Sequence, residues 1–314
     1  MVDEFKLIER FFAPLERDDP ALVVGNGDDG AVFTPRPGTH CVAVMDTLVS
    51  GRHFPTGLAA DSVGYRAMAV NLSDLAAMGA VPRFATLALT LPSADEGWLE
   101  AFARGMREAM ATESLSLIGG DTTQGPLSIT VHLIGEISGD PLTRGGALPG
   151  HVVAVTGTLG DAAGGLALML ADGSATDEAM VGAKLSAETD AAERLRRRFV
   201  RPASRVELGA KLRGIASAAI DISDGLVADA GHLAAASQCA IEIDANRVPL
   251  SQDLLALHEV SSARNLALSG GDDYELLLAL PRDRIDQATR LAAQCECSLS
   301  VIGEVISGSA SRSS

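Results

Sequence analysis

Apolar and polar residues alternate along the first part of the chain with the spacing of short strands separated by helices. Apolar positions three and four residues apart predict helices over residues 4–13, 59–79 and 95–112. The second of these segments is apolar on most sides, which is typical of a buried helix. Strand patterns cover residues 21–24, 41–45, 85–91, 115–118 and 127–134. The first half is therefore predicted to be rich in strands.

The segment SGDPLTRGGALPG at residues 138–150 is dense in glycine and proline, which predicts a domain boundary. Beyond it, strands are predicted over residues 151–156, 240–244, 276–280 and 299–305, with a short one entering residues 220–225. Helices are predicted over residues 161–171, 187–199, 204–218 and 283–294, and after Gly225; Asp161 and Ser204 are the expected N-caps. We therefore expect two α/β or α+β domains, residues 1–138 and 139–314, followed by a frayed GSASRSS tail.

Composition narrows the class of protein. The chain has 314 residues, 47% of them hydrophobic, and a formal net charge of −16. Such an acidic surface repels polyanions, so nucleic acid is excluded as a partner unless metal ions intervene. No uncharged apolar stretch approaches the roughly 18 residues of a membrane helix, and the first residues have no basic leader, so no membrane partner is expected. The four scattered cysteines indicate reduced thiols and a cytoplasmic protein.

Acidic residues gather where predicted strands end, mostly beside glycine. They are Asp28, Asp29, Asp121, Asp221, Asp224, Asp272 and Asp273; Asp46 ends a strand pattern without glycine. Glycine permits a positive φ and a close approach of a ligand to the backbone. A carboxylate at the tip of a buried strand is rigid and suits a hard cation such as Mg²⁺. Taken alone, each motif is more typical of a turn or a helix cap than of a metal site.

Asp74 is unusual in another way. It lies in the apolar segment AMAVNLSDLAAMGAV, three residues after Asn71, so the two share a helix face. No Lys or Arg lies between Arg66 and Arg83 to neutralise it locally. A buried carboxylate is costly unless it is paired or bound to metal, so either a distant arginine or a cation is expected.

Together the six motifs favour a single function. Converging carboxylates raise one another's pKa unless cations neutralise them, and Mg²⁺ bridges carboxylates to substrate phosphates. The sequence therefore predicts a site with several Mg²⁺ ions that handles a polyphosphate. The chain has no Walker loop, protein-kinase motif set or EF-hand loop. Asp140, Asp161 and the charged run at residues 187–198 are expected to face solvent.

Six motifs in this order resemble the thiamine-monophosphate kinase family: GNGDDGAV, MDTLVSGRHF, AVNLSDLAAMGA, IGGDTTQGP, IDISDGL and SGGDDYELLLAL. The resemblance spans about residues 3–305. It implies a two-domain PurM-like fold, with a strand-rich N-terminal domain for ATP, Mg²⁺ and dimerisation and an α/β C-terminal domain. It also implies that ATP phosphorylates thiamine monophosphate by direct in-line transfer, in a homodimer joined through the N-terminal domains.

The resemblance also implies roles for individual residues. The Mg²⁺ ligands would be Asp29, Asp46, Asp74, Asp121, Asp221 and Asp224, of which Asp46, Asp121 and Asp224 would be catalytic. ATP would contact Gly120, Asp121, Arg144 and Ser223. The thiamine phosphate would contact His53 and Asp272. Asp273, Tyr274 and Glu275 are expected to orient the turn that carries Asp272.

The chain departs from the family pattern at Val44 and Met45, where the family often has Ser or Thr, so only backbone carbonyls could assist a metal there. No aromatic residue follows Tyr274 to stack on the thiamine. The alternatives are another ATP-using enzyme of the same superfamily, such as an aminoimidazole ribonucleotide synthetase-like or maturation ATPase, and a non-catalytic Mg-nucleotide-binding relative. The absence of a cysteine before Cys41 disfavours selenophosphate synthesis.

Overall fold

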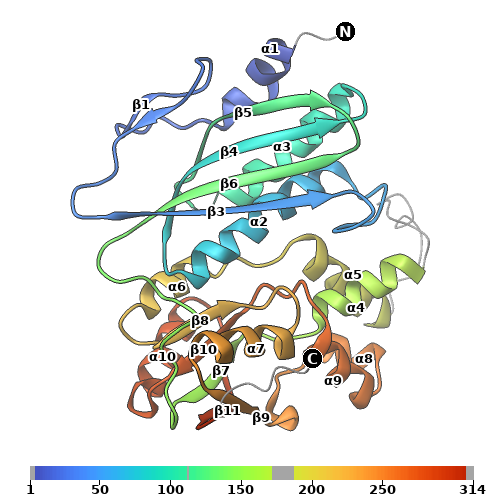
Figure 1. Ribbon diagram of the computed structural model, residues 1–314. Coiled ribbons are helices and arrows are strands. Elements are labelled where there is room, and N and C mark those ends of the chain that lie inside the picture. The colour runs from blue at the N-terminus through green and yellow to red at the C-terminus, as the bar shows by residue number, and fades with distance from the viewer. Residues whose placement is uncertain (1–3, 112, 172–186, 309–314) are drawn as a thin grey trace. The chain divides into compact units, whose positions relative to one another are not determined.

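The protein is described by a computed structural model that covers residues 4–111, 113–171 and 187–308 (Figure 1). Apart from Gly308, the predicted frayed tail lies outside these ranges. The chain forms two compact units. Unit 1 takes the described residues up to Leu75 and Val81–Gly139, and unit 2 takes Ala76–Ala80 and the described residues from Asp140 onward.

Unit 1 is built on a four-stranded sheet in the order β3-β6-β4-β5 (Figure 1). Its strands are β3 (His40–Val49), β6 (Ser128–Ile137), β4 (Val81–Leu91) and β5 (Ser116–Gln124). Neighbours are antiparallel except β4 and β5, which are parallel. The helices α2 (Ala60–Ala77) and α3 (Glu96–Met110) cover one face of this sheet, the helix face. The other face is called the open face.

The remaining elements of unit 1 are short. The predicted first helix is α1 (Glu4–Leu7), which continues as a π-helical turn, Ile8–Phe12, and a 3-10 turn, Ala13–Leu15. The strands β1 (Leu22–Val24) and β2 (Val32–Phe33) form a separate pair. Asp95 starts α3 because its side chain accepts a hydrogen bond from the Trp98 amide at 3.0 Å.

Unit 2 contains a five-stranded antiparallel sheet in the order β8-β10-β7-β11-β9. Its strands are β7 (Val152–Thr156), β8 (Ala218–Asp221), β9 (Ala240–Ile243), β10 (Leu276–Leu280) and β11 (Leu299–Ile306). Its helices are α4 (Asp161–Ala171), α5 (Ala187–Val200), α6 (Val206–Leu212), α7 (Leu226–Ala236), α8 (Gln252–Leu257), α9 (Val260–Ser269) and α10 (Ile285–Gln294), with 3-10 turns at Ala245–Arg247 and Arg282–Arg284. Every residue of β7 and β10 is buried, as continuous apolar runs require.

Several sequence expectations are wrong in detail. The strands holding Asp46 and Asp121 do not end there, because β3 pairs with β6 as far as Val49 and β5 pairs with β4 as far as Gln124. The helix expected to run from Ser204 to about residue 218 is only α6, Val206–Leu212, and Ser204 accepts a weak 3.3 Å hydrogen bond from the Val206 amide.

Two residues expected in solvent are instead part of a polar cluster inside unit 2. Asp161 is 3% exposed, and its carboxylate accepts hydrogen bonds from the hydroxyls of Thr158 and Ser251. Arg198, within the charged run, donates to Glu275 at 2.8 Å. Asp161 therefore begins α4 but does not cap it, since its oxygens are taken by side-chain hydroxyls.

No helix among the described residues is both long enough and apolar enough to cross a membrane.

Candidate functional site

Asp46 lies on the helix face of unit 1, against α2. Its amide donates to the side-chain oxygen of Asn71 at 2.9 Å, and the Asn71 side-chain nitrogen donates to the Ala67 carbonyl at 3.0 Å. Asn71 therefore joins β3 to α2, and half-buried Asp74 follows it by less than one turn. Burial raises the pKa of the Asp46 carboxyl, an effect that nearby His53 opposes. Burial thus penalises the charged carboxylate of Asp46, and a positive charge nearby would offset that penalty.

His53 lies in the turn that follows β3. Its Nδ1 accepts the Val49 amide at 3.0 Å, and the ring is exposed. This hydrogen bond orients the imidazole relative to the end of β3. It uses Nδ1 and does not involve Nε2.

The cross-strand register separates Asp46 from Asp121. Asp46 pairs with Val131, Val131 with Leu87, and Leu87 with Gly120, so one row crosses the whole sheet on the helix face. The next row joins Thr47, Thr130, Ala88 and Asp121 on the open face. Asp46 and Asp121 therefore lie on opposite faces and at opposite edges, three strand spacings or about 14 Å apart. One cation cannot bind both carboxylates of a single chain.

Gly120 packs against β4 without room for a side chain. A Cβ on Gly120 would lie 1.9 Å from the Leu87 carbonyl oxygen, and its φ is +156°. The register between β4 and β5 shifts at this point. A small pocket of about 20 Å³ opens here, lined by Ile8, Phe12, Asn26, Leu87, Leu117, Gly119, Gly120, Asp121 and Thr122. Apolar side chains from the N-terminal helical turns therefore meet the GGD segment.

Asp28 and Asp29 lie in an exposed turn between β1 and β2. The Asp28 carboxylate accepts the Asp29 amide at 2.8 Å, which is a local turn contact of the kind expected as the alternative to metal binding. The turn is anchored beside β5, because the Asn26 side chain donates to the Leu117 carbonyl at 2.7 Å. The Asp29 carboxylate itself stays exposed.

In unit 2, two loops carry the remaining candidates and are joined along their backbones. One loop, residues 222–225, links β8 to α7, and the other, residues 270–275, links α9 to β10. The Asp272 amide donates to the Ser223 carbonyl at 2.9 Å, and the Tyr274 amide donates to the Ile222 carbonyl at 2.9 Å. The structure thus brings together Ser223, Asp224 and Asp272, which are far apart in the sequence.

Asp272 and Asp221 have different environments in these loops. Asp272 is half-buried with φ +71°, and its carboxylate accepts the Tyr274 hydroxyl at 3.2 Å. Asp221 ends β8 as the sequence suggested, is 5% exposed, and pairs with Leu276 of β10. Asp224 is exposed.

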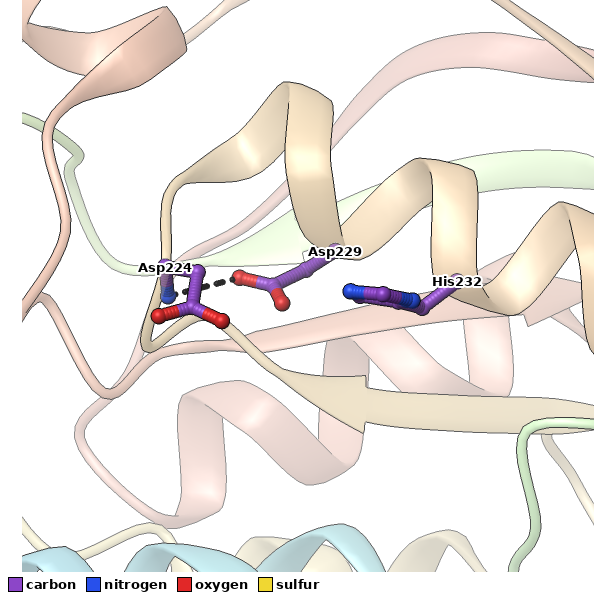
Figure 2. Close-up of side chains that lie close together, drawn as sticks. All are labelled: Asp224, Asp229 and His232. Atoms are coloured by element: carbon purple, nitrogen blue, oxygen red, sulfur yellow. Dashed lines mark hydrogen bonds between the residues drawn. The ribbon is translucent and has the colours of Figure 1, made fainter. Parts of the chain in front are cut away.

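A carboxylate that the sequence analysis missed holds the first loop. Asp229 of α7 is 2% exposed, and its Oδ2 accepts the amides of Ser223 and Asp224, both at 3.1 Å. Figure 2 shows the contact with Asp224. Burial raises the pKa of Asp229, and the amides oppose that effect. Oxygens or nitrogens of Asp224, Asp229 and His232 lie within 4.8 Å of one another. The signal was the one used for Asp74, a lone carboxylate in an apolar helix, LVADAGHLAAA.

Arg144 lies away from this pair of loops. Its carbonyl accepts the hydroxyl of Ser237 at 2.9 Å, and Ser237 follows the last turn of α7. Ser223 and Asp224 precede the first turn of the same helix, whose 11 residues span about 16 Å. The exposed Arg144 is therefore not brought to Ser223 within unit 2.

Asp273 and Glu275 turn inward and fix the second loop, as expected. The Asp273 carboxylate accepts the amides of Gly160 at 2.7 Å and Ala162 at 3.3 Å, at the start of α4. Burial raises the pKa of Asp273 to about 8. Glu275 is fully buried; burial alone would raise its pKa, but Arg205 and Arg198 hold it below the ordinary value.

The exposed or half-buried carboxylates suit a hard divalent cation. Among the described residues, no Lys or Arg forms a salt bridge with Asp29, Asp46, Asp121 or Asp224. The same sequence neutralises its structural carboxylates with arginine, as at Glu275 and Glu136. Oxygen donors without a cationic partner fit Mg²⁺, whereas the described cysteines lie outside these loops.

The fold and its acidic loops define a class. The family model of the AIR synthase related protein N-terminal domain matches residues 27–137, and that of the C-terminal domain matches residues 149–313. The chain therefore belongs to the AIR synthase related proteins, in the branch formed by the thiamine-monophosphate kinases. Both the predicted family and the PurM-like fold are confirmed.

Three relatives support that branch. Thiamine-monophosphate kinase of Salmonella typhimurium is 44% identical over 88% of this chain and 82% of its own. The crystal structure of thiamine-monophosphate kinase from Stenotrophomonas maltophilia K279a has a TM-score of 0.87 and 46% identity, covering 98% of this chain and 95% of that one. AaThiL complexed with AMPPCP and TMP has a TM-score of 0.76 and 32% identity, covering 88% and 84%.

Proposed function

We propose that acidic loops of this chain hold Mg²⁺ and align ATP with thiamine monophosphate for direct in-line transfer of the γ-phosphoryl group. The chain catalyses ATP-dependent phosphorylation of thiamine monophosphate to thiamine diphosphate, as its family membership indicates. The observation that carries the mechanistic proposal is that Asp29, Asp46, Asp121 and Asp224 form no salt bridge with Lys or Arg in the described part of the chain. Four free cysteines are consistent with a cytoplasmic enzyme.

The proposed Mg²⁺ ligands are Asp29, Asp46, Asp74, Asp121, Asp221 and Asp224. When bound, Mg²⁺ would screen the repulsion between donor and acceptor phosphates and neutralise charge in the loose transition state. Of this chain's residues, Asn71 holds the backbone at Asp46, and the loop containing Asp224 is fixed through its amides. Such fixed donors align the phosphates without reorganising during the reaction.

The proposed contacts to the substrates follow the loops. Gly120, Asp121 and Ser223 would meet ATP, and the missing side chain at Gly120 lets β5 pack closely against β4 at this point. Arg144 would contact phosphate at a separate point, because it lies at the other end of α7 from Ser223. His53 and Asp272 would bind the thiamine phosphate, each oriented by a backbone contact.

A homodimer is proposed from two features of unit 1. Alternate residues of edge strand β3 are exposed on the open face, including Met45 at 64% and Val49 at 37%. An exposed apolar edge strand favours association with another chain. In addition, Asp46 and Asp121 cannot share a cation within one sheet. A second copy that supplies Asp121 to the Asp46 of the first would complete such a site.

The direct test is an assay of the purified protein with thiamine monophosphate, Mg²⁺ and ATP labelled on the γ-phosphate. Label in thiamine diphosphate without a labelled protein intermediate is the expected result. ADP formation only with another acceptor would indicate a different enzyme of the superfamily. Tight binding of Mg²⁺ and ATP without turnover on any acceptor would indicate a non-catalytic relative.

A further inference from the structure

The buried carboxylate of Asp229 contacts the backbone of a loop proposed to bind ATP and metal. Asp229 is 2% exposed, and it sits in the first turn of α7. Its amide donates to the Gly225 carbonyl at 3.0 Å, which fixes the position of its backbone in the helix. Its Oδ2 accepts the amide of Ser223 and that of Asp224, the second of which is drawn in Figure 2. One rigid side chain therefore determines where two successive loop residues lie.

The backbone contacts of this loop to residues 270–275 are made on its other side. Gly225, the residue before α7, has φ +111° and offers no side-chain cap to the helix. Without Asp229, the amides of Ser223 and Asp224 would lose their side-chain acceptor. The opposite side of the loop is held by the Asp272 amide on the Ser223 carbonyl. The two contacts together hold Ser223 from both sides.

The neighbouring groups leave two roles for Asp229, ligand or positioning residue. Asp224, Asp229 and His232 are close enough to surround a cation. However, Oδ2 of Asp229 is already occupied by two amides, and the carboxylate is buried, whereas Asp224 and His232 are exposed. The hydrogen bonds and the burial both favour a positioning role.

We propose that Asp229 is a positioning residue that holds Ser223 and Asp224 for the Mg²⁺-nucleotide complex and does not itself bind the metal. The proposal rests on the assignment of Ser223 and Asp224 made under the proposed function. It predicts that the affinity for Mg²⁺ and ATP requires an acceptor oxygen at residue 229 but does not require a negative charge there.

The test compares three substitutions by steady-state kinetics at saturating thiamine monophosphate. Asp229→Ala should raise the half-saturating Mg²⁺ concentration and the KM for ATP about 10–100-fold, the usual effect of removing a residue that supports a metal ligand. Asp229→Asn keeps an acceptor oxygen and should restore both constants to near the wild-type values. Asp229→Glu keeps the charge but misplaces it and should resemble Asp229→Ala.

Two controls separate positioning from stability and from ligation. Asp95→Ala removes the cap of α3, so it should lower the unfolding midpoint without changing the Mg²⁺ dependence. His232→Ala should also leave the Mg²⁺ dependence unchanged. If Asp229→Ala does not fold, the contrast between Asp229→Asn and Asp229→Glu still decides the question.

Three results would overturn the proposal. The first is evidence that Asp229 or His232 binds the metal. Such evidence would be an Asp229→Asn variant as impaired as Asp229→Glu, or a His232→Ala variant with a raised half-saturating Mg²⁺ concentration. The second is an Asp229→Ala variant that loses only stability while Ser223→Ala and Asp224→Asn lose activity. The third is normal kinetics in Ser223→Ala and Asp224→Asn, which would remove the site assignment as well.

Discussion

The amide of Asp272 and the carbonyl oxygen of Ser223 are 2.9 Å apart and hydrogen-bonded. Asp272 is proposed to bind the thiamine phosphate and Ser223 to contact ATP. The hydrogen bond therefore holds the two proposed binding residues on one rigid pair of loops. A Cβ on Gly271 would lie 2.4 Å from the same carbonyl, so the approach also requires glycine next to Asp272. A shift of either loop is therefore expected to alter both substrate contacts together.

Asp46→Asn should reduce kcat by at least about 100-fold while the protein stays folded. The side chain is proposed to bind Mg²⁺, and its replacement removes a charge that burial already disfavours. Steady-state kinetics and the unfolding midpoint are to be measured together. Asp140→Asn is the matched control: Asp140 is exposed and lies outside the proposed site, so activity should change little. Near-normal turnover of Asp46→Asn at moderate Mg²⁺ would contradict the assignment.

Gly120→Ala should lower the free energy of unfolding by about 1–3 kcal/mol and weaken ATP binding, because the added Cβ collides with the Leu87 carbonyl. Gly119→Ala is the neighbouring control, since a Cβ at that position meets nothing within 4 Å. Urea unfolding and calorimetric titration with a non-hydrolysable ATP analogue measure the two effects. Equal effects of both substitutions would show that neither stability nor ATP binding depends on the close approach of β5 to β4.

Asp273→Asn should change how stability depends on pH. The pKa of Asp273 is raised to about 8 by burial, so the folded protein binds a proton that the unfolded chain releases near pH 4. Its stabilising contribution is complete below the unfolded pKa and is lost as pH rises toward 8, by at most about 1.4 kcal/mol per pH unit. The free energy of unfolding of Asp273→Asn should therefore rise relative to that of the wild type between pH 5 and pH 8.

The measurement is urea unfolding at several pH values, with Asp140→Asn as control because Asp140 is exposed. A difference between Asp273→Asn and wild type that is the same at every pH would show that Asp273 stays ionised in the fold.

Arg205→Met should destabilise the protein by about 3 kcal/mol, because it removes a bidentate partner from fully buried Glu275. Arg282→Met breaks the exposed pair with Glu304 and should cost less than about 1 kcal/mol. Thermal unfolding of both variants checks the contrast. Similar losses would mean that Arg198 alone is enough to compensate Glu275.

Mixing two inactive variants tests the shared site. If Asp46 of one chain and Asp121 of another form each site, refolding Asp46→Asn with Asp121→Asn should give mixed dimers with one intact site, and about a quarter of wild-type activity overall. If each chain supplies both residues to its own site, no mixed dimer regains activity. Met45→Glu, on the open face, should convert the dimer to monomers in sedimentation velocity runs.

Local sequence patterns predicted the helices and strands wherever one face of the element is buried and the other is exposed. The pattern around Asn71 and Asp74 correctly predicted α2, and the Asn71 contact with Asp46 explains why a polar face was kept in an apolar helix. The ends of β3 and β5 could not be predicted, because they depend on pairing with β6 and β4. The separation of Asp46 from Asp121 follows from that register alone.

Burial of individual carboxylates was harder to predict than their position along the chain. Asp161 looked like a solvent-facing helix cap, but the residue that meets the start of α4 is Asp273, more than 100 positions later in the sequence. No local pattern links the two. Asp229, by contrast, was detectable, since it interrupts an apolar helix as Asp74 does.

Backbone amides at the start of α4 and just before α7 are already hydrogen-bonded to side chains, and this affects phosphate recognition. The positive end of a helix dipole is a common docking point for anions, because its free amides point at the ligand. In this chain Asp273 takes amides at the start of α4, and Asp229 takes those preceding α7. A triphosphate approaching these two helices would meet carboxyl groups that already occupy the amides, where many nucleotide enzymes present bare peptide nitrogens. Its recognition there depends on the counterions that accompany it.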